Sequence, residues 1–314
     1  MLTFALIGAA GYIAPRHMKA MAESGGKLIV AYDPNDSVGI IDTYFPDAAF
    51  FVEFERFDRH LDKMRRNGNK IDYVSVCSPN YLHDAHCRFA MRSDANAICE
   101  KPVVLNPWNI DGLEQIEKET SRKVSTILQL RLHPTIQRLK DMVDKSSKNE
   151  FAVDLTYITS RGPWYQTSWK GDDNKSGGIA TNIGVHFFDM LIFVFGSVQR
   201  SVLHQHNVEM AAGYIECERA KIRWFLSISA ADLPENVRGK KSTFRSITLD
   251  GQEIEFSEGF TDLHTASYKE IVGGRGYSLA DVRPSIELVS GFRSQPVELN
   301  IGERHPFVIS RAIK

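Results

Sequence analysis

A short apolar run followed at once by a glycine-rich turn restricts the fold of this chain more than any other feature. Residues 3–7 (TFALI) are typical of a strand, Gly8-Ala9-Ala10-Gly11 follows directly, and a helical pattern then continues to Ala22. Further apolar runs at 28–32 and 73–77 alternate with helical stretches. Alternating short strands and helices indicate βαβ units and a parallel sheet. The first part of the chain is therefore expected to be an α/β Rossmann domain.

The turn and a later acid predict a dinucleotide site. Glycines let the backbone turn tightly and approach a pyrophosphate at a helix N-terminus. The spacing here is GxxGxxA rather than GxGxxG, so a glycine turn without a ligand is the alternative. Asp33, 25 residues after Gly8, follows the second strand and can accept hydrogen bonds from ribose hydroxyls. This acid favours NAD over NADP. The turn residues expected to bind the cofactor are Gly8, Ala10, Gly11, Tyr12 and Ile13.

Two later strand ends carry polar residues. Glu100-Lys101-Pro102 follows the run 95–99, at the carboxyl edge where open α/β sheets bind ligands. The proline keeps Lys101 out of helical geometry, so the lysine is expected in the cofactor cleft rather than solvated. Gln129, Arg131 and His133 follow another expected strand at 124–128 and are expected at the same edge.

The second half of the chain has a different pattern. Longer strands are expected at 151–160, 213–219, 222–230, 245–249 and 253–256, with a helix at 178–195. These elements predict an α+β domain with a large, mainly antiparallel open sheet. We expect a dinucleotide-binding domain at 1–125 and a substrate-binding and oligomerisation domain at 126–314, with a return of the chain towards the first domain left open.

Composition excludes several classes of function. The chain has 38 basic and 39 acidic residues, a net charge of −1, which argues against a nucleic-acid partner. It has no apolar run of roughly 20 residues, so no membrane span is expected. Its four cysteines form no CxxC pair. This cysteine usage is typical of a reducing compartment and predicts a cytoplasmic protein.

The expected helix at 178–195 carries the second group of polar residues. Asn182, His186 and Asp189 are spaced to share one helix face. A buried histidine satisfied by Asp189 is one interpretation. A general base is the other, because a histidine titrates near working pH. No third ligand has an evident spacing, so no metal site is expected.

Together these motifs resemble the Gfo/Idh/MocA oxidoreductases over nearly the whole chain. The motifs are the GxxGxxA turn, Ser78-Pro79-Asn80 with His83, Glu100-Lys101-Pro102, and GGxxxNxGxHxxD at 177–189. The resemblance implies an NAD-dependent dehydrogenase in which Lys101 and His186 flank the oxidised carbon. The family usually has Asp where this chain has Asn182, which puts a three-member proton relay in doubt. The implied cofactor-binding residues beyond the turn and Asp33 are Ser78, Pro79, Asn80, His83, Glu100, Lys101 and Gln129.

Within this family, several strings resemble bacterial enzymes that oxidise UDP-N-acetylglucosaminuronic acid (UDP-GlcNAcA) at C3. They lie at 161–165, 168–172, 175–178, 231–234, 264–268 and 275–277. Such enzymes serve lipopolysaccharide O-antigen synthesis, in which the 3-keto sugar is next transaminated. The implied substrate-binding residues are Arg161, Trp164, Lys170, Lys175, Asn182, His264 and Tyr268, with Arg275, Arg283 and Trp169 as further candidates.

The resemblance also implies a homo-oligomer, a dimer or a tetramer, and 2-oxoglutarate as a co-substrate that recycles NADH. His186 is favoured as the base and Lys101 as donor to the C3 oxygen, with the reverse assignment kept open. The alternative functions are a dehydrogenase of another sugar or an inositol, a glycosidase that uses tightly held NAD, and a non-catalytic NAD-sensing module.

Overall fold

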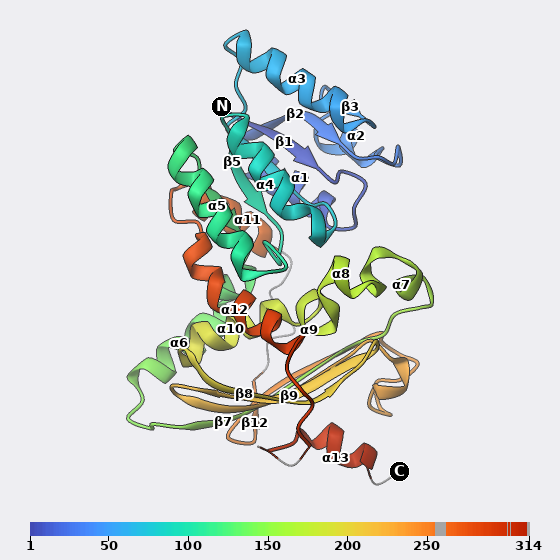
Figure 1. The fold of residues 1–314 in the computed structure, drawn as a ribbon, viewed down its shortest axis with the longest axis vertical. Coiled ribbons are helices and arrows are strands. Elements are labelled where there is room, and N and C mark those ends of the chain that lie inside the picture. Colours follow the sequence, from blue (N-terminus) through green and yellow to red (C-terminus); the bar gives the residue numbers. More distant parts are fainter. Residues whose placement is uncertain (255–261, 300, 302, 313–314) are drawn as a thin grey trace. The chain divides into compact units, whose positions relative to one another are not determined.

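The computed structural model describes residues 1–254, 262–299, 301 and 303–312 (Figure 1). The chain forms two compact units: unit 1 comprises Met1–Leu132 with Thr261–Arg283, and unit 2 comprises His133–Phe260 with Pro284–Lys314. The sequence predicted a boundary at 125/126 and left open a return of the chain towards the first domain. In the structure the chain changes unit at 132/133, 260/261 and 283/284, so a C-terminal segment returns to unit 1.

Unit 1 contains a parallel six-stranded sheet with the order β3-β2-β1-β4-β5-β6. The order reverses between β1 and β4, and ligands of open α/β sheets bind at the carboxyl ends beside such a reversal. This confirms the predicted Rossmann architecture and places the glycine turn at the reversal. The strands are β1 (Leu2–Ile7), β2 (Gly26–Tyr32), β3 (Ala49–Phe51), β4 (Tyr73–Val76), β5 (Asn96–Cys99) and β6 (Val124–Thr126).

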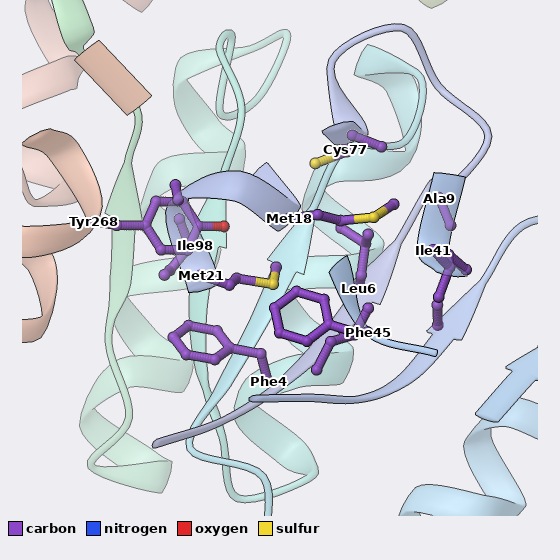
Figure 2. Packing of buried hydrophobic residues seen from close by; sticks show 14 of the residues in the cluster. Phe4, Leu6, Ala9, Met18, Met21, Ile41, Phe45, Cys77, Ile98 and Tyr268 are labelled. Carbon is purple, nitrogen blue, oxygen red and sulfur yellow. The ribbon is translucent and has the colours of Figure 1, made fainter. Parts of the chain in front are cut away.

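The helices of unit 1 bury apolar faces against this sheet. Figure 2 shows Phe4 and Leu6 of β1 packed with Met18 and Met21 of the following helix, and with Tyr268 from the returning segment. The Tyr268 ring lies 5.9 Å from that of Phe4. The helices are α1 (Ala14–Glu23), α2 (Ile40–Tyr44), α3 (Phe54–Arg66), η1 (Asn80–Leu82), α4 (His83–Arg92), α5 (Pro107–Thr120), η2 (Gln129–Leu132) and α11 (Leu263–Val272); α12 (Leu279–Phe292) crosses the last unit boundary.

Unit 2 contains a mixed sheet with the order β12-β11-β7-β10-β9-β8, in which only β7 and β10 pair in parallel among the described strands. This confirms the expected, mainly antiparallel sheet. The strands are β7 (Phe151–Thr159), β8 (Val198–His206), β9 (Met210–Cys217), β10 (Ala220–Ser227), β11 (Thr243–Leu249) and β12 (Gln252–Glu253). Strand β8 was not predicted, and the end of the expected strand 253–256 lies outside the described residues.

Helices α6, α9 and α10 lie on one face of this sheet, and the short α13 lies on the other (Figure 1). Phe188 packs edge-on against Trp224 of β10 at 5.0 Å, while Val308 joins the core around Phe225 on the other face. The helices are α6 (Pro134–Lys145), α7 (Trp164–Thr167), η3 (Trp169–Gly171), α8 (Asp173–Ser176), α9 (Gly178–Asn182), α10 (Val185–Phe195), η4 (Ala230–Asp232) and α13 (Pro306–Ala312).

The predicted continuous helix at 178–195 is wrong. Helix α9 ends at Asn182 and α10 begins at Val185, and the helical stretch 173–182 meets α10 at a bend of 45°. Gly184 lies at the break, where a Cβ would approach the Ala180 oxygen and the Leu226 side chain to 2.5 Å. The chain thus passes too close to the sheet for a side chain here. Asn182 is therefore on a different helix from His186 and Asp189.

Among the described residues, no single helix has the length and apolarity to cross a membrane. The bent pair 173–182 with 185–195 passes that test only when its two parts are taken together. Most residues of α10 are buried in unit 2.

We predict that acid destabilises both units through buried histidines. Burial lowers the pKa of His86 in unit 1 and of His305 in unit 2 to about 4. The unfolded chain, with histidine pKa values near ~6.5, therefore binds more protons, so stability is full above pH ~6.5 and is lost towards pH ~4. Each histidine accounts for about 3 kcal/mol of this loss.

Urea denaturation at a series of pH values measures the effect. The free energy of unfolding should fall steadily between pH 6.5 and 4 on this argument, and His305→Gln, which takes up no proton, should show a shallower fall. A free energy that is constant over this interval would contradict the prediction.

Candidate active site

The glycine turn after β1 allows a backbone approach that no other residue permits. Gly8 has φ +91°, and a Cβ on it would lie 2.6 Å from the carbonyl carbon and oxygen of Cys77. Its N–H donates to the Tyr32 oxygen at 2.8 Å, and Gly11 N–H donates to the Gly8 oxygen at 3.1 Å. The turn is therefore held between the ends of β2 and β4, directly before the start of α1.

Asp33 lies against this turn, as the sequence predicted for an acid at the end of β2. One carboxylate oxygen accepts a hydrogen bond from the Ala10 N–H at 3.0 Å. The other accepts hydrogen bonds from the backbone N–H of Asn35 at 2.9 Å and from its side-chain Nδ2 at 3.1 Å. The residue is 6% exposed. A carboxylate oxygen can accept more than one hydrogen bond, so this group suits a ribose diol. The glycine cradle, helix start and acid together fit a dinucleotide.

The loop after β4 is joined to the loop after β5 through His83. Its Nδ1 lies 2.6 Å from the Pro102 oxygen and its Nε2 lies 2.7 Å from the Ser78 oxygen. Burial lowers the pKa of His83, and the two backbone contacts oppose that effect. Ser78 also contacts His86 Nδ1 at 2.8 Å through its hydroxyl. The predicted cofactor residues Ser78, Pro79, Asn80 and His83 thus form one short segment beside the glycine turn.

The Glu100-Lys101-Pro102 motif leaves β5 with its glutamate turned inward. Glu100 is 6% exposed, and its Oε1 lies 2.9 Å from Nε2 of both His17 and His264. Burial acts to raise the pKa of Glu100, but hydrogen bonds from these histidines outweigh it and hold the pKa well below its ordinary value. Lys101 is partly buried and is followed by a cis peptide bond to Pro102.

His264 and Tyr268, predicted to bind substrate, lie on α11 inside unit 1. They are 4% and 0% exposed. The Tyr268 hydroxyl contacts His17 Nδ1 at 2.8 Å and the Ser75 hydroxyl at 2.6 Å. A phenol with no exposed surface belongs to the core of the unit rather than to a binding surface. The burial of these two residues therefore does not support their predicted role in substrate binding.

In unit 2, the segment 161–175 gathers cations and aromatic rings; we call it the basic–aromatic segment. Lys170 Nζ lies over the rings of Trp169 at 4.3 Å and Trp164 at 5.7 Å. Burial lowers the pKa of Lys170, and the charge of Arg161 lowers it further. Trp164 is 52% exposed, whereas Lys175 pairs with Asp172 at 3.5 Å. An exposed indole beside two cations suits an anionic ligand that carries a planar ring.

Asn182 is tied to this segment through Tyr165. Its Nδ2 donates to the Tyr165 hydroxyl at 2.6 Å. Burial raises the pKa of Tyr165, and the contact with Asn182 acts against that rise. Tyr165 was part of a predicted string but received no role, because its buried position is not visible in the sequence.

The two predicted catalytic groups belong to different units. Lys101 follows β5 of unit 1, and His186 lies in the first turn of α10 in unit 2. The His186 ring is half-buried, with its centre 4.2 Å from that of Phe187 and 6.2 Å from that of Tyr157. Asp189, on the same helix, is buried.

The remaining candidates have structural partners within their own units. Arg275 pairs with Glu270 at 2.7 Å, and Arg283 with Asp111 and Glu114 at 2.8 and 3.0 Å. Arg131 lies over the Tyr277 ring, and His133 caps α6 by accepting the Thr135 N–H. Gln129 lies in η2, and its role stays a prediction. His17 was missed, although a histidine on the apolar face of α1 was a usable signal.

Comparisons with known proteins agree with this geometry. Residues 2–128 match the family model GFO_IDH_MocA, described as an oxidoreductase family with an NAD-binding Rossmann fold. Residues 149–287 match GFO_IDH_MocA_C, the C-terminal alpha/beta domain of that oxidoreductase family.

Two crystal structures of the WlbA (WbpB) dehydrogenase from Thermus thermophilus superpose on the chain with TM-scores of 0.94. Each match covers 98% of this chain and 100% of that one. One, 48% identical, is a complex with NAD and alpha-ketoglutarate. The other, 46% identical, is a complex with NAD and UDP-GlcNAcA.

Curated proteins match over shorter regions. The inositol 2-dehydrogenase of Rhizobium meliloti is 29% identical over 204 residues, which is 63% of this chain and 56% of that protein. The scyllo-inositol 2-dehydrogenase (NADP(+)) IolW of Bacillus subtilis is 23% identical over 224 residues, 68% of this chain and 60% of that protein. The chain thus spans little more than half the length of these curated relatives.

We predict that Gly8→Ala weakens NAD binding. The added Cβ meets the Cys77 backbone at 2.6 Å, and the positive φ is unfavourable for alanine. NADH affinity, measured by fluorescence titration, should fall at least ~10-fold. Gly39→Ala is the matched control, because Gly39 has an ordinary φ of −53° and no neighbouring atom within 4 Å of its Cβ position. Equal affinity in the two variants would refute the assignment.

Proposed function

Because the chain belongs to the Gfo/Idh/MocA family of oxidoreductases, we propose that it oxidises the C3 hydroxyl of UDP-GlcNAcA with NAD as the hydride acceptor. The observation that carries this proposal is the whole-length likeness, at 46% identity, to a dehydrogenase whose structure contains NAD and UDP-GlcNAcA. The basic–aromatic segment supports it independently, because a nucleoside diphosphate joined to a sugar acid needs cations and a flat apolar surface.

Unit 1 supplies the residues that would hold NAD. The Gly8–Gly11 turn and the start of α1 suit the pyrophosphate, and Asp33 suits the adenosine ribose. The segment Ser78–His83 and Lys101 follow neighbouring strands at the same carboxyl edge. When bound, NAD accepts the hydride from the sugar carbon.

The protein's own side chains must remove the proton of the C3 hydroxyl. We assign His186 as the general base that takes the proton from the C3 hydroxyl, because imidazole titrates near neutral pH. Lys101 donates a hydrogen bond to the same oxygen as it becomes a carbonyl. The C3–H bond and the O–H bond both break, and a ketone, a reduced cofactor and protonated His186 result.

Asn182 has a positioning part in this scheme. Its amide accepts and donates hydrogen bonds but takes no proton. The bond from Nδ2 to Tyr165 fixes the plane of the amide. Asn182 therefore orients a sugar hydroxyl without entering the proton path.

The cations of unit 2 are assigned to the substrate's anionic groups. Arg161 and Lys170 are the assigned partners of the diphosphate and the carboxylate, and Trp164 is the surface for the uracil ring. Lys170 is partly desolvated between two indoles. Such a cation is less hydrated than a surface lysine, so an anion that binds to it gains more interaction free energy than it would from a surface lysine. Lys175 is a weaker candidate, since Asp172 already neutralises it.

We further propose that NADH is recycled in place by 2-oxoglutarate, which would leave as the 2-hydroxy acid. A relative 48% identical to this chain was crystallised with NAD and alpha-ketoglutarate. The 3-keto product is suited to transamination, as O-antigen synthesis requires. We place the enzyme in the cytoplasm as a homo-oligomer, a dimer or a tetramer. The four cysteines, all free thiols, support a reducing compartment.

The direct test incubates the protein with NAD and UDP-GlcNAcA, with and without 2-oxoglutarate. Mass spectrometry should show a sugar nucleotide that has lost two hydrogens, with more product when the oxo acid is present. UDP-GlcNAc, which lacks the carboxylate, and myo-inositol are the comparison substrates. Turnover of myo-inositol in place of the sugar nucleotide would reject the proposed substrate, and no oxidised product from any of them would reject the function.

We predict that Lys101→Ala and His186→Ala each lower kcat by about 10² or more, the usual contribution of a positioned acid or base. The exposed Lys145→Ala, at the end of α6, serves as the control. The pH–rate profile identifies the base, because the variant that lacks it also loses the acid limb. Loss of that limb in Lys101→Ala alone would reverse the two roles, and near-normal turnover in both would refute the assignment.

A further inference from the structure

A buried group of polar side chains contacts the backbone of Lys101 and takes no part in the proposed proton transfer. It comprises His17 of α1, Glu100 at the end of β5, and His264 of α11; we call it the Glu100 cluster. The three ligand-type atoms lie within 4.8 Å of one another, and all three residues are buried. Each element belongs to unit 1.

The hydrogen-bond directions in the Glu100 cluster are fixed by chemistry. An ionised carboxylate only accepts, so the Nε2 atoms that lie 2.9 Å from Oε1 must both carry a proton. Burial lowers the pKa of His17, which favours the neutral ring. A neutral His17 with a protonated Nε2 accepts at Nδ1, where the Tyr268 hydroxyl lies 2.8 Å away. Every contact is satisfied with one negative charge on Glu100.

These separations favour protons over a metal ion in the cluster. Zinc with ligands at 2.0–2.1 Å in a tetrahedron would hold neighbouring ligand atoms about 3.3 Å apart. The observed 2.9 Å is instead the usual length of an N–H···O hydrogen bond. The cluster is therefore a hydrogen-bonded carboxylate.

The other carboxylate oxygen faces Lys101. The backbone N–H of Lys101 donates to Glu100 Oε2 at 3.2 Å. One oxygen thus contacts α1 and α11, and the other contacts the backbone that carries the lysine. The returning segment contacts the motif through His264, and its Tyr268 hydroxyl contacts His17 Nδ1 and the Ser75 hydroxyl of β4.

We propose that His264 is a positioning residue: together with His17 it keeps the Glu100 carboxylate ionised and oriented, and the carboxylate in turn holds the backbone of Lys101. The proposal rests on the proposed function in that Lys101 contacts the reacting hydroxyl. On this proposal the returning segment, through His264 of α11, supplies unit 1 with the second hydrogen-bond donor to the buried Glu100 carboxylate.

A matched set of variants separates this role from simple packing. His264→Leu removes the donor at similar volume, whereas His264→Gln keeps an N–H at the position of Nε2. Thr265→Val is the control, because Thr265 joins the same two helices through a 2.6 Å hydrogen bond to Glu23 and does not contact Glu100. Glu100→Gln keeps the shape but cannot accept hydrogen bonds on both sides.

The expected result is a fall in kcat of about 10-fold in His264→Leu and Glu100→Gln. A hydrogen bond to a charged group contributes a free energy that corresponds to about this factor in rate. His264→Gln should recover to within about threefold, and Thr265→Val should equal the wild type. The pH–rate profile of His264→Leu should show an additional loss of activity on its acid side, separate from the limb assigned to His186, because Glu100 then protonates more readily. NADH affinity should be unchanged in His264→Leu, His264→Gln and Thr265→Val.

A second measurement needs no substrate. Acid unfolding of His264→Leu should begin at higher pH than that of His264→Gln or the wild type, since Glu100 stabilises the fold only while it is ionised. If His264→Leu does not fold, Glu100→Gln against the wild type provides the kinetic comparison.

The outcomes distinguish the two proposals. No turnover in the wild type refutes the proposed function, and the acid-unfolding series then decides whether the cluster holds an ionised Glu100. Turnover without this additional acid-side loss in His264→Leu, or equal defects in His264→Leu and Thr265→Val, refutes the positioning role. One equivalent of zinc per chain that is lost in His264→Leu, measured by elemental analysis, would overturn the hydrogen-bonded interpretation.

Discussion

The close contact between Gly8 and the end of β4 is the constraint on which the rest of unit 1 depends. With no Cβ, Gly8 lies against the carbonyl of Cys77 while its N–H bonds to β2. The first turn therefore lies between the ends of β2 and β4, beside the reversal of strand order between β1 and β4, and α1 starts there. That position brings His17 into contact with Glu100 at the end of β5, and Asp33 into contact with Ala10 of the turn. A side chain at this point would separate the strand ends and move every group assigned to the cofactor.

Local patterns predicted the elements whose signal is carried by consecutive residues. The glycine turn, the acid after β2 and the motif after β5 all lie where the sequence placed them, since strand periodicity and turn residues are local properties. Strand β8 was missed, because its exposed positions include Gln199 and Arg200 and its alternation is weak. The break between α9 and α10 was missed because it comes from the closeness of Gly184 to Leu226, which belongs to a strand far along the chain.

In the candidate site, too, local sequence patterns do not predict contacts between segments that are far apart in the chain. Lys101 and His186 are identifiable from motifs, but the surroundings of each come from distant segments. Glu100 receives donors from positions 17 and 264, and no spacing rule connects these residues. His264 and Tyr268 illustrate the consequence: their string is distinctive, yet its distinctiveness reflects buried contacts in unit 1 as much as any ligand. A resemblance identifies which residues matter more readily than it identifies what they contact.

Charge placement explains how a nearly neutral chain can handle an anionic substrate. The net charge of −1 describes the field far from the molecule, where screening removes most of it. Close to the surface, Lys170 lies over the rings of Trp164 and Trp169 in unit 2 and feels the charge of Arg161, while unit 1 buries a negative charge at Glu100. A buried carboxylate is costly unless donors satisfy it, and His17 and His264 each supply a donor to Glu100. The ionised carboxylate lies next to the backbone of Lys101, the residue proposed to donate to the developing carbonyl, and the two histidines favour its ionised form.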